Sequence, residues 1–251
     1  MSELPRISPS VSRFFLSYSR RHLRKHFHAT RILKGHTPEF PNGPIIIFSN
    51  HASWWDPLVC FVFARHFLPD RSHYGPIDSR ALERYPIFKK LGFFGVPIDQ
   101  KGNAAPRVFL SQTKVILEEE KSVLWLTPQG AFVDPRVRPL EFEAGLGYLI
   151  RKYPDIPFFP LAFEYPFWEE RTPELLSAFG SWLGPGVSPE SALTDLQDTL
   201  ANAAIKRDEA DFETLLGGSA GVGGIYDRWR HFAARLFGKK FEKEHSSLNK
   251  L

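Results

Sequence analysis

The sequence predicts an α/β domain with a largely parallel sheet and flanking helices. Short runs rich in β-branched and aromatic residues have the composition of buried strands. They are Ile45–Ser49, Gly95–Ile98, Ser122–Leu126 and Pro157–Phe163. Helical patterns lie between them, and strands that alternate with helices are typical of a parallel sheet. The chain has 251 residues, of which 43% are apolar, so it can bury a substantial core.

The helical patterns lie before and between these strands along the chain. An apolar periodicity spans residues 9–34 ahead of the first strand. Asp56 followed by Pro57 has the pattern of an N-cap and a first-turn proline, which predicts a helix over 57–67. Further helices are predicted over 104–121 and 143–153. We assign residues 39–188 to one catalytic domain.

Positive charge is concentrated at the N-terminus. Eight Arg and Lys and no acidic residue lie between Leu4 and Pro38, which leaves 24 basic and 28 acidic residues elsewhere. On a helix, Arg13, Arg20, Arg24 and Arg31 fall within about 40° of one another, opposite two apolar stripes. Residues 1–38 are therefore predicted to be a basic amphipathic helix in the interface of an anionic membrane. The alternative is a helix packed on the core with a solvated basic face.

The location of the charge also bears on partners and localisation. The remainder of the chain is net acidic, which disfavours nucleic-acid binding. No apolar run approaches the roughly 20 residues that span a bilayer. We therefore expect a peripheral, monotopic protein on the cytoplasmic face of a membrane. The single cysteine, Cys60, excludes a disulfide framework and a Cys-rich zinc site.

The last quarter of the chain, residues 189–251, is predicted to be a helical segment packed on the same domain. Residues 189–215 have a polar helical pattern, and five glycines between 217 and 224 indicate a flexible connector. From Ile225 a strongly amphipathic helix is predicted, which docks on the domain or on a membrane. Its apolar face consists of Trp229, Phe232, Ala233, Leu236 and Phe237.

The residues most suited to chemistry stand between the first strand and the 57–67 helix, in Asn50–Pro57. Loops at the carboxyl ends of parallel strands commonly hold the sites of α/β proteins. Across such a loop His51 and Asp56 can face each other, and a carboxylate beside an imidazole makes a general base that works near pH 7. The alternative is that Asp56 only caps the helix and His51 is a polar loop residue.

Four segments in order over about 44–165 resemble the blocks of the glycerolipid acyltransferase family, which acylates glycerol 3-phosphate or its lyso derivatives. The first block, N-H-x-x-x-x-D, is matched by Asn50, His51 and Asp56. The second, I-D-R, resembles Ile98-Asp99, with Gln100 in place of arginine and Lys101 next. The third, F-P-E-G-T-R, is similar to Thr127-Pro128-Gln129-Gly130-Ala131-Phe132. The fourth, a strand with a central proline, resembles Pro157–Leu161.

The resemblance implies an O-acyltransferase that moves a fatty acyl group from acyl-CoA or acyl carrier protein to a lysophosphatidic-acid-like lipid in phospholipid or glycerolipid synthesis. It implies His51 as general base, oriented by Asp56, with no resident cofactor and no metal. Amides near Gly130, with Pro128 and Gln129 in the same loop, are candidates for holding the oxyanion. Asp99, Gln100, Lys101 and Arg136 are the acceptor-binding candidates.

The departures from the family pattern leave the acceptor open. Gln100, Gln129 and Phe132 stand where the family has two arginines and a glutamate. Lys101, Arg136 or Arg138 can supply the missing charge, or the acceptor is a less anionic lyso-aminolipid, glycolipid or other lipid alcohol. A non-catalytic lipid-binding protein on the same fold is a further alternative. A serine hydrolase is disfavoured because the one G-x-S-x-G match, at 217–221, falls in the glycine-rich stretch that is interpreted as a flexible connector.

Overall fold

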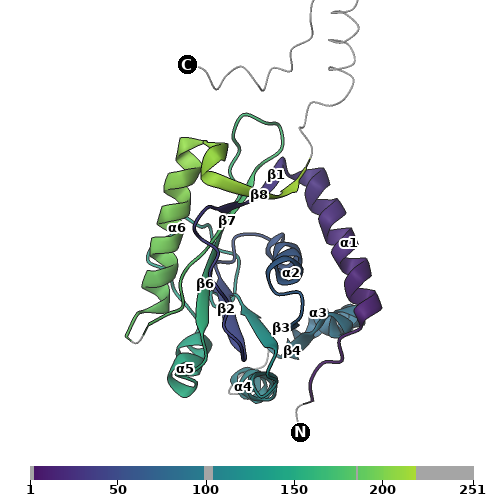
Figure 1. Ribbon diagram of the computed structural model, residues 1–251. Helices are drawn as coiled ribbons and strands as arrows, with labels where there is room; N and C mark the ends of the chain where they lie inside the picture. Colours follow the sequence, from purple (N-terminus) through teal and green to yellow (C-terminus); the bar gives the residue numbers. More distant parts are fainter. Residues whose placement is uncertain (1–2, 99–103, 185, 219–251) are drawn as a thin grey trace, which may run out of the picture.

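The computed structural model describes residues 3–98, 104–184 and 186–218. Within these ranges eight strands form a single sheet in the order β4-β3-β5-β2-β6-β7-β1-β8 (Figure 1). The strands are β1 (Ala29–Leu33), β2 (Ile45–Ser49), β3 (Ser72–Asp78), β4 (Phe93–Val96), β5 (Ser122–Leu126), β6 (Phe158–Glu164), β7 (Leu175–Phe179) and β8 (Phe212–Gly217).

The five strands from β4 to β6 all run parallel. Beyond them β7 is antiparallel to β6, β1 is parallel to β7, and β8 is antiparallel to β1. The predicted α/β class with a largely parallel sheet is therefore confirmed. The central strand β2 lies between β5 and β6, so the residues that follow β2 emerge at the carboxyl edge of the parallel half.

Helices cover both faces of the sheet (Figure 1). They are α1 (Pro9–His26), α2 (Asp56–Phe67), α3 (Ser79–Arg84), α4 (Ala104–Leu117), α5 (Ala144–Lys152) and α6 (Pro189–Lys206), with 3₁₀ turns η1 (Pro86–Leu91) and η2 (Glu209–Asp211). Alternate residues of a strand point to opposite faces. Accordingly Ile46 and Phe48 join the core beneath α4, α5 and α6, whereas Ile45 and Ile47 join the core beneath α1 and α2.

The first predicted helix, over 9–34, is too long. It ends at His26, and Ala29–Leu33 forms β1, whose five residues are all buried between β7 and β8. Arg31 is therefore no part of an exposed arginine line. Its guanidinium lies 3.0 Å from Glu174 and 2.8 Å from Glu209, and is 5% exposed. The periodicity of the segment was misleading because distant strands hold residues 29–33 in an extended conformation.

The predicted helix over 189–215 is also too long. It stops at Lys206, where Arg207 adopts a left-handed conformation with φ of 55°, and the chain continues through η2 into β8. Strands β3 and β7 were not predicted, and β4 begins two residues before the predicted Gly95. The glycines beyond Gly218 and the helix predicted from Ile225 lie outside the described residues.

Candidate active site

The predicted pairing of His51 with Asp56 is present at the carboxyl end of β2. His51 follows β2 by two residues, and Asp56 is the first residue of α2. His51 Nδ1 lies 2.8 Å from Asp56 Oδ2, and the side chains are 18% and 1% exposed, respectively. The loop between strand and helix turns the two groups toward each other, so the imidazole keeps access to solvent while the carboxylate is buried.

The Asp56 carboxylate accepts three hydrogen bonds. Besides His51, the Ser53 amide donates to Oδ2 at 3.0 Å, and the Tyr165 hydroxyl donates to Oδ1. The predicted N-cap role of Asp56 is wrong, because Trp55 occupies that position and the Asp56 side chain turns back to Ser53. Burial and the adjacent Asp56 raise the pKa of Tyr165 well above its usual range, so Tyr165 stays a proton donor to the carboxylate.

These contacts define the tautomer of the neutral imidazole. An ionised carboxylate only accepts hydrogen bonds, so in neutral His51 the hydrogen is on Nδ1 and the Nε2 lone pair is free. A proton taken up at Nε2 yields an imidazolium that the buried carboxylate stabilises. The arrangement is that of an oriented general base.

The loop after β5, which holds the third sequence block, is fixed directly to this motif. The backbone N–H of His51 donates to Gln129 Oε1 at 2.8 Å, and the Val133 N–H donates to the His51 carbonyl at 2.9 Å. At the far end of the loop, the Glu143 N–H donates to the Pro128 carbonyl at 2.8 Å. Gln129 supplies the acceptor oxygen that a glutamate would also supply, without its charge.

Gly130 forms a tight turn in this loop. Its φ of +67° favours glycine, and an added Cβ would lie 3.2 Å from Glu143 Cγ. The Gly130 N–H donates to the Thr127 carbonyl at 3.1 Å. In this arrangement the Gly130 amide serves the turn, so an oxyanion role would fall to its neighbours in the loop.

Phe132, at the position of the family's arginine, packs on the catalytic candidate. Its ring centroid lies 4.4 Å from that of His51, and its side chain is 60% exposed. An arginine here would place a cation beside the imidazole and oppose its protonation. The phenyl ring instead gives His51 an apolar neighbour that is compatible with an imidazolium.

The acceptor-binding candidates are placed only in part. Asp99, Gln100 and Lys101 lie outside the described residues. The Arg136 guanidinium donates to both oxygens of Asp134, at 2.8 and 2.6 Å, and the pKa of Asp134 is held well below its usual range by these bonds. Arg138 donates to Asp198 at 2.6 Å. Both arginines considered as replacements are therefore already paired with carboxylates.

Two further residues complete the site: Asn50, which the sequence placed in the first block without a role of its own, and Tyr165, which the sequence did not single out. The Asn50 side chain binds both backbone groups of Phe163, at 2.8 and 3.0 Å, and so ties the motif to β6. Tyr165 stands just beyond β6 and reaches Asp56. Its position at the carboxyl end of a predicted central strand was the signal that could have identified it, because such ends converge on one edge.

Comparison with known proteins identifies the class. A family model described as Acyltransferase matches residues 31–164, which is more than half of the chain and includes His51, Asp56 and the third block. The chain belongs to this family. It is an acyltransferase, and the family implies an acyl donor and a lipid acceptor.

Among solved structures, the chain is similar to the 1-acyl-sn-glycerophosphate (LPA) acyltransferase PlsC from Thermotoga maritima. The two share 15% sequence identity with a TM-score of 0.49, over 79% of this chain and 80% of the other. No curated protein matched the chain. In the part of the chain that the structure describes, every helix is too short or too polar to cross a membrane.

Proposed function

We propose that the protein transfers a fatty acyl group from an acyl thioester, acyl-CoA or acyl carrier protein, to a hydroxyl of a lipid acceptor. The observation that carries the proposal is the hydrogen bond between His51 and the buried Asp56 at the carboxyl edge of the sheet. No group of the chain has to be acylated in this scheme. Two acceptor classes suit it: lysophosphatidic-acid-like lipids, as in phospholipid synthesis, and non-phosphorylated lipid alcohols.

The geometry supports the following steps as part of the proposal. His51 Nε2 takes the proton of the acceptor hydroxyl as the oxygen attacks the thioester carbonyl, and Asp56 stabilises the imidazolium. The tetrahedral intermediate expels the thiolate as the C–S bond breaks, and the proton passes from His51 to the thiolate. Positioning of the two substrates at one site supplies much of the acceleration.

Turnover of acyl-CoA or acylated carrier protein with a total lipid extract tests this function. His51→Ala should lower acyl transfer by at least about 100-fold, in line with the loss of a general base. Asp56→Asn should lower it strongly with little change in fold. His66→Ala is the matched control, because His66 is exposed on α2 and should leave the rate unchanged. A wild-type protein that binds lipid but turns over no thioester with any acceptor would instead indicate a lipid-binding protein.

We also propose that α1 places the enzyme on an anionic membrane surface at the cytoplasmic face. Arg13, Arg20 and Arg24 are exposed along α1, and the aromatic side chains of Phe14 and Tyr18 are 73% and 47% exposed. Each basic residue near such a surface contributes about 1 kcal/mol. Changing the three arginines to glutamine should weaken binding to anionic vesicles by roughly 100-fold. Vesicle binding that neither salt nor these changes affect would contradict the proposal.

A further inference from the structure

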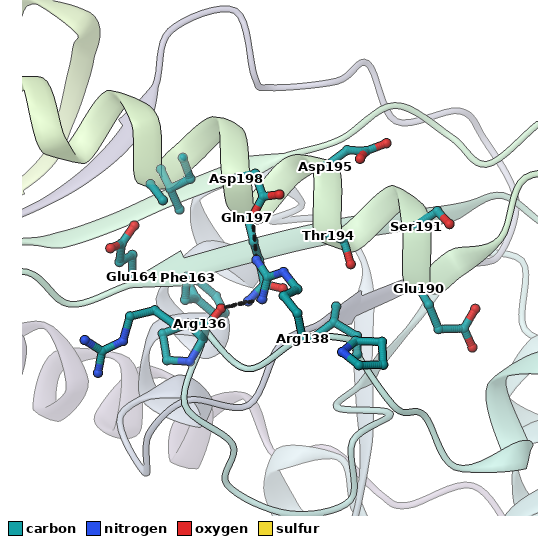
Figure 2. Close-up of a pocket in the computed structure, with 15 residues that line it drawn as sticks. Arg136, Arg138, Phe163, Glu164, Glu190, Ser191, Thr194, Asp195, Gln197 and Asp198 are labelled. Atoms are coloured by element: carbon teal, nitrogen blue, oxygen red, sulfur yellow. Dashed lines mark hydrogen bonds and ion pairs between the residues drawn. The ribbon is translucent and has the colours of Figure 1, made fainter.

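A pocket of about 790 Å³ lies beside the candidate active site, between α6, the end of β6 and the segment that follows the third block (Figure 2). Nine of the fifteen residues that line it are charged or polar. Neither His51 nor residues 128–130 line it. The charged residues of the lining are Arg136, Arg138, Glu164, Glu190, Asp195 and Asp198.

The lining has an excess of carboxylates. Figure 2 shows Arg138 bonded to Asp198, which neutralises both. Arg136, near Glu164 at one end of the pocket, is bonded to Asp134 outside the lining. Among the described residues no cation makes an ion pair with the remaining carboxylates, those of Glu164, Glu190 and Asp195.

Other polar groups of the lining also favour a hydrogen-bond donor. Gln197, 4% exposed, donates through Nε2 to the Pro135 carbonyl at 3.2 Å, while its Oε1 has no donor in the described part of the chain. Burial raises the pKa of Glu164, with the positive charge of Arg136 opposing the rise. A bound cation or hydroxyl would compensate this half-buried carboxylate.

The positive end of α6 is not free for a phosphate. The Ser188 hydroxyl oxygen accepts the Ser191 N–H at 3.3 Å, and the Ser188 hydroxyl donates to Glu190 Oε2 at 2.6 Å. A carboxylate and a capping hydroxyl therefore occupy the place where an anion would benefit from the helix dipole. On both sides, a phosphate in the pocket would meet carboxylates that have no ion-pair partner among the described residues, Glu164 on one side and Glu190 and Asp195 on the other.

Two sets of hydrogen bonds connect the segments that line the pocket to the His51 loop. Phe163, which precedes Glu164 on β6, is held by the Asn50 side chain, and Val133, two residues before Pro135, is bonded to the His51 carbonyl. A head group in the pocket is thus positioned by the same segments that position the general base.

From this arrangement we propose that the pocket binds the head group of the acyl acceptor, and that this head group is rich in hydrogen-bond donors, as an ammonium or several hydroxyls, and lacks a phosphate. The proposal rests on the proposed acyl transfer. It assigns Glu164 and Asp195 as specificity-determining residues, and it selects the non-phosphorylated class of acceptor over lysophosphatidic acid.

Initial rates with acyl-CoA and three acceptors at equal concentration test the proposal: sphinganine for an ammonium, dodecyl glucoside for hydroxyls, and lysophosphatidic acid for a phosphate. At least one of the first two should exceed lysophosphatidic acid by tenfold or more. Glu164→Gln and Asp195→Asn should each raise the KM for sphinganine about tenfold, because the charge-assisted bond is lost, and leave kcat unchanged. For dodecyl glucoside the KM should change little, since an amide still accepts hydroxyl donors.

Glu213→Gln, a change at an exposed carboxylate on β8 away from the pocket, is the matched control and should alter no constant. Preference for lysophosphatidic acid, or pocket variants that shift the KM for acyl-CoA instead of the acceptor, would overturn the head-group assignment. A parallel reaction with total lipid separates the two levels. Acylated phospholipid as the product refutes only the pocket assignment, whereas no acylated product at all refutes the acyl-transfer function.

Discussion

Removing the Tyr165 hydroxyl tests whether the buried carboxylate must be held for the imidazole to work. Tyr165→Phe deletes the donor to Asp56 Oδ1 and leaves Ser53 and His51 as donors to Oδ2. A hydrogen bond to a charged group contributes about 1.5–3 kcal/mol. We expect the free energy of unfolding to fall by about 2 kcal/mol. Because Asp56 is then held through Oδ2 alone and is less firmly oriented, kcat should fall by roughly tenfold with the acceptor KM unchanged.

Tyr74→Phe provides the matched control. The Tyr74 hydroxyl donates to Glu119 at 2.6 Å, far from the His51 motif in the fold, so its loss also removes a bond to a carboxylate. Urea unfolding and steady-state acyl-CoA turnover are measured for both variants. Equal kcat values for the two variants would refute the positioning role of Tyr165. The Tyr165 hydroxyl would then contribute only to the stability of the fold.

Three further outcomes are expected. Gly130→Ala should lower kcat by displacing the loop that holds Gln129 on His51, and should lower the free energy of unfolding by about 1 kcal/mol because of backbone strain. Gly35→Ala is the control, because Gly35 has φ of +77° and no atom within 4 Å of the added Cβ; it should lose the same stability and keep its kcat. Arg31→Gln removes the closest charge partner of Glu174, which is 1% exposed and keeps only His28 at 3.8 Å, and should lower the free energy of unfolding by about 3–5 kcal/mol, measured by urea titration. Burial lowers the pKa of His73 to about 4, so His73 is neutral in the folded protein at a pH where it is already protonated in the unfolded chain. The free energy of unfolding should therefore be constant above about pH 6.5 and fall by up to about 3 kcal/mol toward pH 4. Much of that loss should disappear in His73→Asn. A variant whose stability depends on pH as steeply as that of the wild type would contradict this assignment to His73.

The sequence was most informative where local pattern and tertiary structure agree. Ile45–Ser49 and Ser122–Leu126 were predicted to the residue, because runs of this composition are stable only between neighbouring strands. The pairing of His51 with Asp56 followed from their spacing across a strand-to-helix loop. The catalytic role assigned to the pair stays a prediction.

Other elements depend on contacts that no local pattern encodes. Thr30 and Arg31 continue a helical periodicity, yet β1 pairs with β7 and β8 more than 140 residues later. Partners at that distance override helical propensity. The charge on Arg136 was readable in the sequence, but its capture by Asp134 two residues earlier depends on the loop conformation. The role of Tyr165 likewise depends on tertiary structure, because its hydroxyl reaches Asp56 across the edge of the sheet.

The position of β1 in the sheet has a consequence for synthesis of the chain. Arg31 precedes its partners Glu174 and Thr214 by 143 and 183 residues. At ribosomal rates of about 5–20 residues per second, β1 waits roughly 7–30 s for the first of them. The parallel strands that carry His51 can associate in that interval, while β1 remains an unpaired edge exposed to other chains. We therefore expect truncations that end before β7 to aggregate during translation even though they retain the whole His51–Asp56 motif.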